Sequence, residues 1–357
     1  MPSSISSSDS VPGPDFRRDL PTSVPWSLIA CAAAVLAVAG IGLRESSLRQ
    51  SGRQPAISMQ PGLWAWQRNL VREAPQDSTV LLGSSRMAYG FDQDEWVRCG
   101  GTSRPFMLAW PGGCPRPHLH DMAADKSFRG TLLVGVAPFL FFCNPAFPFP
   151  MSAVGQVKLA QSWGPADEVQ QRIRFVIEPR ASVLLRGDTS LLSVLRHGLD
   201  LPQRDGQITP MRPREFGRCD EHCRMRMFKG FENRPQDILA VKKMFQAWGP
   251  RALLYPPPDV ALVLEKVVQD VEAIRRRGGR VIFVRYPSSG WMRDEERALL
   301  PRAKSWDRLV SETGCLGIHF EDHEELNGFI CPEHSHLTQA DAITFTRRLY
   351  AIIDQAE

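Results

Sequence analysis

The chain has no run of more than three basic residues, no cysteine and histidine spacing typical of a zinc site, and no Gly-x-Ser-x-Gly motif. Its 43 Lys and Arg residues are scattered among 39 Asp and Glu residues, which leaves a formal net charge of only +4 over 357 residues. This dispersed charge argues against nucleic-acid binding, which needs a concentrated positive surface. The missing serine motif argues against the nucleophile elbow of α/β-hydrolases.

The eight cysteines give no metal-binding pattern either. The nearest is CDEHC at residues 219–223, which is too weak to predict a zinc site, and we expect neither a metal nor an organic cofactor. In an exported domain the cysteines would favour disulfides, with Cys99–Cys114, Cys219–Cys223 and Cys315–Cys331 as candidate pairs. In a cytosolic domain they would be reduced, buried thiols, and the cysteines alone leave both interpretations open.

The N-terminal region divides into a polar segment and an apolar one. Residues 1–24 are rich in Ser, Pro and Asp, a composition that predicts disorder. Residues 25–43 contain no charged side chain and would extend roughly 28 Å as a helix, about one bilayer core. Core helices are usually amphipathic, whereas this segment is apolar all round, so we predict an uncleaved transmembrane anchor. Residues 44–60 are expected to form a linker to a domain over residues 61–357.

Strands and helices alternate along that domain. Strands are expected at 78–83, 105–110, 130–142, 280–287 and 315–322, and helices at 63–74, 118–128, 260–279, 301–314 and 338–356. Residues 130–142 are apolar without alternation, which is typical of a strand buried on both faces in a parallel sheet. The pattern predicts an α/β fold with a doubly wound, mostly parallel, flavodoxin-like sheet. Residues from about 150 to 259 break the alternation and predict a mostly helical insertion.

One strand ends in a polar turn, Gly-Ser-Ser-Arg at residues 83–86. Ligands bind at the carboxyl ends of strands in open α/β sheets, so a serine here is a candidate nucleophile. Such a turn alone is more often structural than catalytic. Near the C-terminus, however, Glu333 stands three residues before His336, and one turn of loop can present an acid and a base together. His334 is a rival base, and Asp322 is a rival acid.

These two short blocks resemble those of the SGNH hydrolase superfamily. That family carries its nucleophile after the first strand in a Gly-Asp-Ser block, and its acid and base before the last helix in Asp-x-x-His. The present blocks read GSS at 83–85 and EHSH at 333–336. They are most similar to the membrane-anchored branch, which includes the D-alanyl transfer protein of the teichoic acid system and periplasmic polysaccharide O-acetyltransferases. The resemblance implies an SGNH-like fold with Ser85 as nucleophile, His336 as base and Glu333 as the orienting acid.

The resemblance also implies backbone donors for an oxyanion. These would be the N–H groups of Ser85 and of Gly112 or Gly113, in the turn after the second strand. The family's oxyanion Asn should follow the third strand, where this sequence has Ala137 and Pro138. Loss of one oxyanion donor costs on the order of 10²–10³ in rate.

The function that the resemblance implies is that of a membrane-anchored serine esterase or O-acyltransferase acting on acyl esters of cell-envelope glycans. The protein would cross the bacterial inner membrane once and place its catalytic domain in the periplasm. An acyl ester or glycan would be its substrate, and a membrane-bound acyltransferase its partner. The missing Asn keeps an alternative open, a non-catalytic SGNH-like module that binds a glycan or such a partner.

Overall fold

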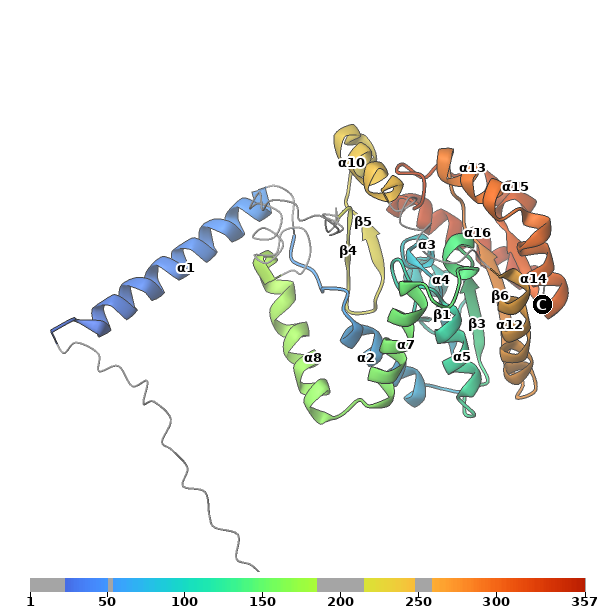
Figure 1. Ribbon diagram of the computed structural model, residues 1–357, viewed down its shortest axis with the longest axis horizontal. Coiled ribbons are helices and arrows are strands. Elements are labelled where there is room, and N and C mark those ends of the chain that lie inside the picture. The colour runs from blue at the N-terminus through green and yellow to red at the C-terminus, as the bar shows by residue number, and fades with distance from the viewer. Residues whose placement is uncertain (1–22, 51–53, 185–214, 248–258, 357) are drawn as a thin grey trace, which may run out of the picture.

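The structure is a computed structural model that describes residues 23–50, 54–184, 215–247 and 259–356. The disorder expected for residues 1–24 falls, except for the last two of them, outside the described part of the chain. At the centre is a five-stranded sheet in the order β2-β1-β3-β6-β7 (Figure 1). Its strands are β1 (Thr79–Leu82), β2 (Phe106–Met107), β3 (Thr131–Gly135), β6 (Arg280–Arg285) and β7 (Leu316–His319).

Every ladder in this sheet is parallel, and this confirms the predicted α/β class with a mainly parallel sheet. The first strand, β1, lies inside the sheet, with β2 on one side and β3 on the other. The direction of winding therefore reverses at β1. In doubly wound sheets such a switch leaves a crevice at the carboxyl ends of the strands, where ligands bind.

Helices pack against both faces of the sheet and form two cores. One core includes residues of α5 (Arg116–Ala124), α12 (Val260–Arg275) and α14 (Trp306–Thr313); the other includes residues of α3 (Ser85–Gly90), α4 (Gln93–Arg98) and α16 (Gln339–Gln355). Val80 and Leu82 of β1 belong to the first core and Leu81 to the second, because side chains alternate across a strand. A strand covered on both faces is apolar throughout, as the sequence indicated. Helix α2 (Pro61–Glu73) precedes β1 in the chain. Helix α13 (Gly290–Leu299) and the short helix η4 (Arg302–Lys304) lie between β6 and β7, and η5 (Phe320–Asp322) and α15 (Glu324–Asn327) follow β7.

The third strand is shorter than the sequence predicted. A strand was expected over residues 130–142, but β3 ends at Gly135 and α6 occupies Pro138–Phe141. Proline has no N–H group for a strand ladder, and its fixed φ suits the first turn of a helix. Pro138 and Phe141 of α6 remain buried, so hydrophobicity alone did not distinguish this helix from a strand.

The apolar N-terminal segment forms α1 (Trp26–Gln50), a helix of 25 residues. It is long and apolar enough to span a membrane. The helix continues beyond the predicted end at Leu43, so the first part of the expected linker is helical. An ion pair between Arg49 and Glu45, one turn apart, lies in this added segment.

The described part of the expected insertion is only partly helical. It contains α7 (Pro148–Gln161), α8 (Pro165–Ile177), the short helices η1 (Glu178–Arg180), η2 (Ser182–Leu184) and η3 (Phe231–Asn233), and α10 (Pro235–Gln246). It also contains an antiparallel hairpin of β4 (Gly217–Cys219) and β5 (Met225–Met227), which the sequence did not predict. The remainder of the insertion, residues 185–214 and 248–258, lies outside the described residues.

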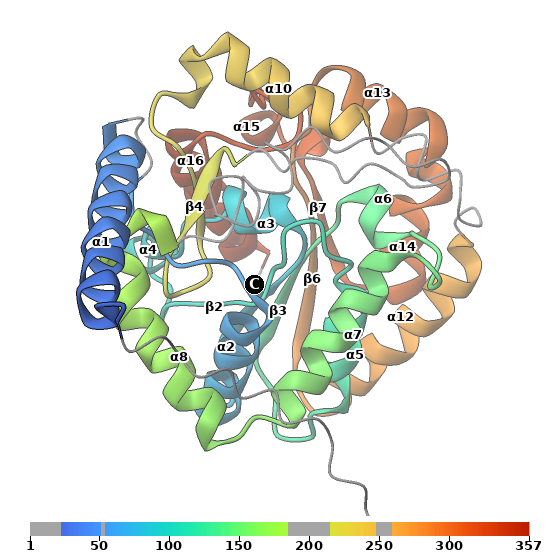
Figure 2. The same cartoon turned by 60° about the vertical axis from the view of Figure 1, so that its left-hand side comes forward.

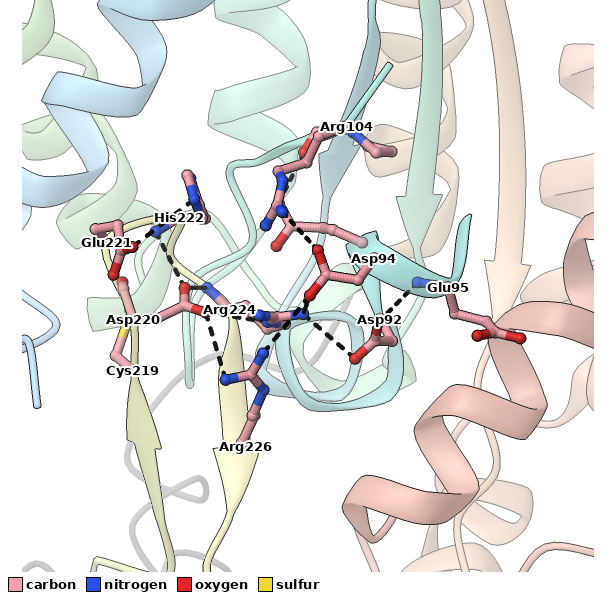
Figure 3. Close-up of polar contacts among 12 residues, drawn as sticks. Asp92, Asp94, Glu95, Arg104, Cys219, Asp220, Glu221, His222, Arg224 and Arg226 are labelled. Atoms are coloured by element: carbon pink, nitrogen blue, oxygen red, sulfur yellow. Dashed lines mark hydrogen bonds and ion pairs between the residues drawn. The ribbon is translucent and has the colours of Figure 1, made fainter. Parts of the chain in front are cut away.

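A charged cluster fastens the hairpin to the sheet domain (Figure 3). The buried Arg224 donates to Asp94 at 2.6 Å and to Asp92 at 3.3 Å, and its Nε donates to Asp220 at 3.0 Å. Asp92 in turn caps α4 by accepting from the Glu95 N–H. A buried guanidinium that meets three carboxylates holds the hairpin in one position against α4.

All eight cysteines are free thiols, so none of the three expected disulfides is formed. Cys315 directly precedes β7, whereas the Cys331 sulfur lies 3.6 Å from the Pro287 carbonyl, just beyond the carboxyl end of β6. Because β6 and β7 are parallel, these two thiols lie at opposite ends of the sheet, too far apart for a disulfide. Cys114 and Cys143, by contrast, lie close enough for their thiols to interact electrostatically.

Candidate active site

Ser85 is the first residue of α3, and only Gly83 and Ser84 separate it from the carboxyl end of β1. Figure 2 shows α3 beyond the upper ends of the central strands. The turn from strand to helix is tight: a Cβ on Gly83 would lie 2.6 Å from the Met87 Cβ and 3.4 Å from the Gly135 Cα. Glycine is needed there because α3 folds back onto the strand tip. The local backbone thus carries the Ser85 hydroxyl to the edge of the sheet.

His336 and Glu333 lie in the loop between α15 and α16 and meet Ser85 there. The His336 Nε2 lies 2.7 Å from the Ser85 Oγ. On the other side of the ring, Nδ1 hydrogen-bonds to the Glu333 carboxylate. The second Glu333 oxygen accepts from the N–H groups of Ser335 at 2.7 Å and of His336 at 3.1 Å. The three-residue spacing therefore closes a turn in which the acid binds both the backbone and the imidazole.

The ionised state of Glu333 fixes the direction of the hydrogen bonds that connect Glu333, His336 and Ser85. Burial alone would raise the pKa of the Glu333 carboxyl, but His336 and the two backbone donors lower it below its ordinary value. An ionised carboxylate can only accept, so the proton between them belongs to His336 Nδ1. In the neutral imidazole, Nε2 then carries the lone pair and accepts from the Ser85 hydroxyl. This is the arrangement needed to remove a proton from a serine.

Aromatic rings surround the imidazole. Tyr89 lies 4.9 Å from His336 between ring centroids, Phe216 lies at 5.1 Å, and Phe245 at 5.9 Å. Phe216 directly precedes β4 and also stacks on Tyr89 at 5.0 Å. The hairpin that Arg224 fastens to α4 thus supplies part of the wall of the site. Sequence reasoning missed Phe216 and Phe245, because they belong to the insertion and lie far along the chain from both Ser85 and His336.

The backbone N–H groups expected to bind an oxyanion differ in whether they already donate to an acceptor in the protein. Trp110 donates its N–H to the Gly83 carbonyl at 2.9 Å, which brings the turn after β2 to the tip of β1. The Gly113 N–H is used within that turn, where it donates to the Trp110 carbonyl at 2.8 Å. Among the described residues, no protein acceptor is found for the N–H groups of Ser85 and Gly112. Gly112 has φ of +67°, which favours glycine there.

No Asn takes the place that the family resemblance assigns to one. Ala137 and Pro138 begin α6 at this position. Asn144 lies beyond that helix, and its side-chain oxygen accepts from the Ala146 N–H at 2.9 Å. The departure noted in the sequence therefore persists in the folded chain.

A second buried cluster adjoins the Ser85–His336 pair. Arg86 follows Ser85, forms an ion pair with Glu296 at 2.6 Å, and donates to the Ser335 hydroxyl at 3.2 Å. Glu296 also pairs with Arg285 at 2.5 Å and accepts from Ser288 at 2.8 Å. Arg86, the residue after the candidate nucleophile, is thereby bonded to Ser335, the residue before the candidate base. Arg285 and Glu296 were not among the residues that the sequence motifs singled out.

The rival residues lie in other contacts. The His334 backbone has φ of +79°, and its ring packs 6.1 Å from that of Trp291. Asp322 forms a two-point ion pair with Arg302, at 2.6 and 2.7 Å, near the surface. Of the candidate acids and bases, Glu333 and His336 are the two that the fold connects to Ser85.

Within the described ranges, no group of three or more His, Cys, Asp or Glu side chains is placed to hold a metal ion. No protein-family model matches this chain, and no curated protein is similar enough to be matched. The fold and the site together define an α/β protein with a parallel sheet and a Ser–His–Glu hydrogen-bond chain at the carboxyl edge of that sheet.

Proposed function

We propose that the chain is a membrane-anchored, SGNH-like serine esterase or O-acyltransferase that acts on acyl esters of cell-envelope glycans. The observation that supports it is the continuous hydrogen-bond chain from Ser85 through His336 to Glu333. In the proposed reaction, the Ser85 oxygen attacks the acyl carbon while His336 Nε2 takes its proton. Glu333 stays ionised and stabilises the imidazolium. The N–H groups of Ser85 and Gly112 are the candidate donors to the oxyanion.

The second half of the reaction would release the acyl group. His336 returns its proton to the departing alcohol, which leaves the acyl group on the Ser85 oxygen. Water or a sugar hydroxyl then attacks that ester and regenerates the serine. These two acceptors separate an esterase from an acyltransferase, and both use the same three side chains.

The proposed location is the bacterial inner membrane, crossed once by α1, with the catalytic domain in the periplasm. The length and apolar character of α1 support the membrane crossing. A membrane-bound acyltransferase that supplies the acyl group remains the proposed partner.

An acyl-enzyme trapping experiment tests the proposed function. The purified full chain in detergent is mixed with an activated acetyl ester, quenched in acid within seconds, and analysed by intact-mass spectrometry. We expect one added acetyl group, which should be absent from Ser85→Ala. Ser311→Ala, a change on the exposed α14 surface, should acetylate like the unchanged protein. Acetylation that is equal in all three proteins would contradict the proposal.

The vacant Asn position favours the second candidate, a non-catalytic module that binds a glycan or a membrane acyltransferase. On that alternative, the folded protein shows no acyl-enzyme. It still binds an acetylated glycan in calorimetry, and Ser85→Ala leaves this affinity unchanged.

A further inference from the structure

Helix α8 has an unusual distribution of side chains. Its exposed residues include four aliphatic ones: Val169 is 57% exposed, Ile173 51%, Val176 56% and Ile177 46%. Steps of four, three and one residues place these side chains on one side of a helix. The face toward the domain is mixed: Gln171 is buried and hydrogen-bonded to Arg174, and Phe175 packs on Trp66 with ring centroids 5.5 Å apart. A helix at the surface of a soluble domain normally keeps its outward face polar, so the outward aliphatic side chains are the unusual feature.

The inner face of α8 is hydrogen-bonded to the domain. Arg174 donates to the Ser58 carbonyl at 2.8 Å and to Glu178 at 2.7 Å, and Glu178 accepts from the Ser58 N–H at 2.8 Å. These contacts fix the rotation of α8 about its axis. The aliphatic stripe, Val169, Ile173, Val176 and Ile177, is therefore held facing outward.

The segment after α8 binds the end of the candidate membrane helix. Arg49 of α1 donates to the Arg180 carbonyl at 2.8 Å, and Glu45 of α1 accepts from the Val183 N–H at 2.8 Å. Figures 1 and 2 both show α1 and α8 on the same side of the domain, and in Figure 1 α8 runs across the direction of α1. If α1 crosses a bilayer, α8 lies along its surface.

We propose that α8 is an interfacial helix whose aliphatic stripe inserts into the bilayer surface beside α1. A lipid surface fits the stripe because it covers an apolar face of any outline and needs no shaped groove. The exposed Arg172, which pairs with Glu168 and lies over the Trp66 ring, would offer positive charge to anionic lipid headgroups in this orientation. With α1 and α8 both in contact with the membrane, the domain would have a fixed tilt, which a single helix cannot impose. The inference does not depend on the catalytic proposal.

Photo-crosslinking in a defined membrane tests this. A benzophenone amino acid is introduced as Ile173→p-benzoylphenylalanine in the full chain, which is reconstituted in liposomes of phosphatidylethanolamine and phosphatidylglycerol. The matched control is Leu299→p-benzoylphenylalanine, because Leu299 is 68% exposed but lies on α13, away from α1. After irradiation, mass spectrometry should find at least about tenfold more lipid adduct at position 173 than at 299.

Three results would overturn the proposal. They are equal lipid adducts at the two positions, adducts at position 173 only to a second copy of the chain, and a full chain that does not stay with the liposomes on flotation. A second measurement avoids the probe. In liposomes, backbone hydrogen exchange over residues 169–177 should be at least about threefold slower in the unchanged chain than in the double variant Ile173→Asp, Val176→Asp. Equal exchange in the two proteins would also count against it.

Discussion

Two glutamates are buried at the carboxyl edge of the sheet, on either side of the Ser85–Arg86 peptide, and their partners differ. Glu333 meets the imidazole of His336, whose other nitrogen faces the Ser85 hydroxyl. Glu296 lies between the guanidinium groups of Arg86 and Arg285. An imidazole exchanges its proton near neutral pH, whereas a guanidinium stays charged. The same type of acid can therefore serve proton transfer in one cluster and only hold the structure in the other.

The clusters are also connected in space. Arg86 donates to the Ser335 hydroxyl, and the Ser335 N–H donates to Glu333. The Arg–Glu–Arg cluster thus braces the turn that presents His336. Separate effects on rate and on stability should distinguish the roles of the two acids.

The largest effect on rate is expected from the residues of the first cluster. Ser85→Ala and His336→Ala should each lower kcat for an activated acyl ester by on the order of 10⁴-fold or more, and the double variant should be no slower. Residues that act as one unit are not additive, which is the reason for the last expectation. Steady-state kinetics measure this. If either variant kept more than about a tenth of the activity, the assignment of that residue would be wrong.

Exchange of each acid for its amide separates the clusters. Glu333→Gln should lower kcat on the order of 10³-fold, because an amide cannot stabilise the imidazolium or hold its tautomer. Glu296→Gln should instead lower the free energy of unfolding by about 3–5 kcal/mol, since it leaves two buried guanidinium groups without their carboxylate. Kinetics and urea unfolding on both variants check this. The reverse outcome, with Glu296→Gln inactive but stable, would exchange the two roles.

Acid should weaken the second cluster over a defined range of pH. Burial alone would raise the pKa of Glu296, but Arg285, Arg86 and Ser288 lower it to about 2. A lowered folded-state pKa gives stability that is present above the ordinary value of about 4.5 and is lost as the pH falls toward 2. The loss should be up to about 3 kcal/mol in urea unfolding between pH 5 and 2. Glu296→Gln should show a shallower decline, and an unchanged slope would contradict this origin.

The smallest effect is expected at Ser84, next to the candidate nucleophile. Ser84 is the N-cap residue of α3, but its side chain makes no capping hydrogen bond. Ser84→Ala should therefore cost less than the roughly 1 kcal/mol of a typical lost cap and should change kcat less than about tenfold. Thermal unfolding and kinetics test both values. A loss of kcat as large as that of Ser85→Ala would contradict the assignment of Ser85, rather than Ser84, as the nucleophile.

The part of the site that is local in sequence could be predicted. Ser85 follows a strand, and Glu333 and His336 share one turn, so short motifs contained the information. Parallel-sheet topology then brings the two ends of the domain together, over a separation of 251 residues. The predicted length of β3 was wrong, because an apolar run has the same composition in a strand and in a buried helix. Pro138 was the residue that indicated a helix.

The parts that were missed depend on contacts between distant segments. Glu296 is on α13, Arg285 ends β6, and Phe216 precedes a hairpin fastened by Arg224. Each is an ordinary residue of its own segment, and only the folded chain shows its partner. The expected disulfides failed for the same reason, since spacing along the chain does not say at which end of the sheet a thiol lies.

The most direct test of the account is covalent labelling by a fluorophosphonate, which reacts with a serine only when a base activates it. The purified full chain is labelled at neutral pH, digested, and sequenced by tandem mass spectrometry. We expect one phosphonylated residue, Ser85, with labelling lost in His336→Ala and retained in Glu296→Gln below its unfolding temperature. An unlabelled Ser85 in the folded protein, or labelling that persists without His336, would contradict it.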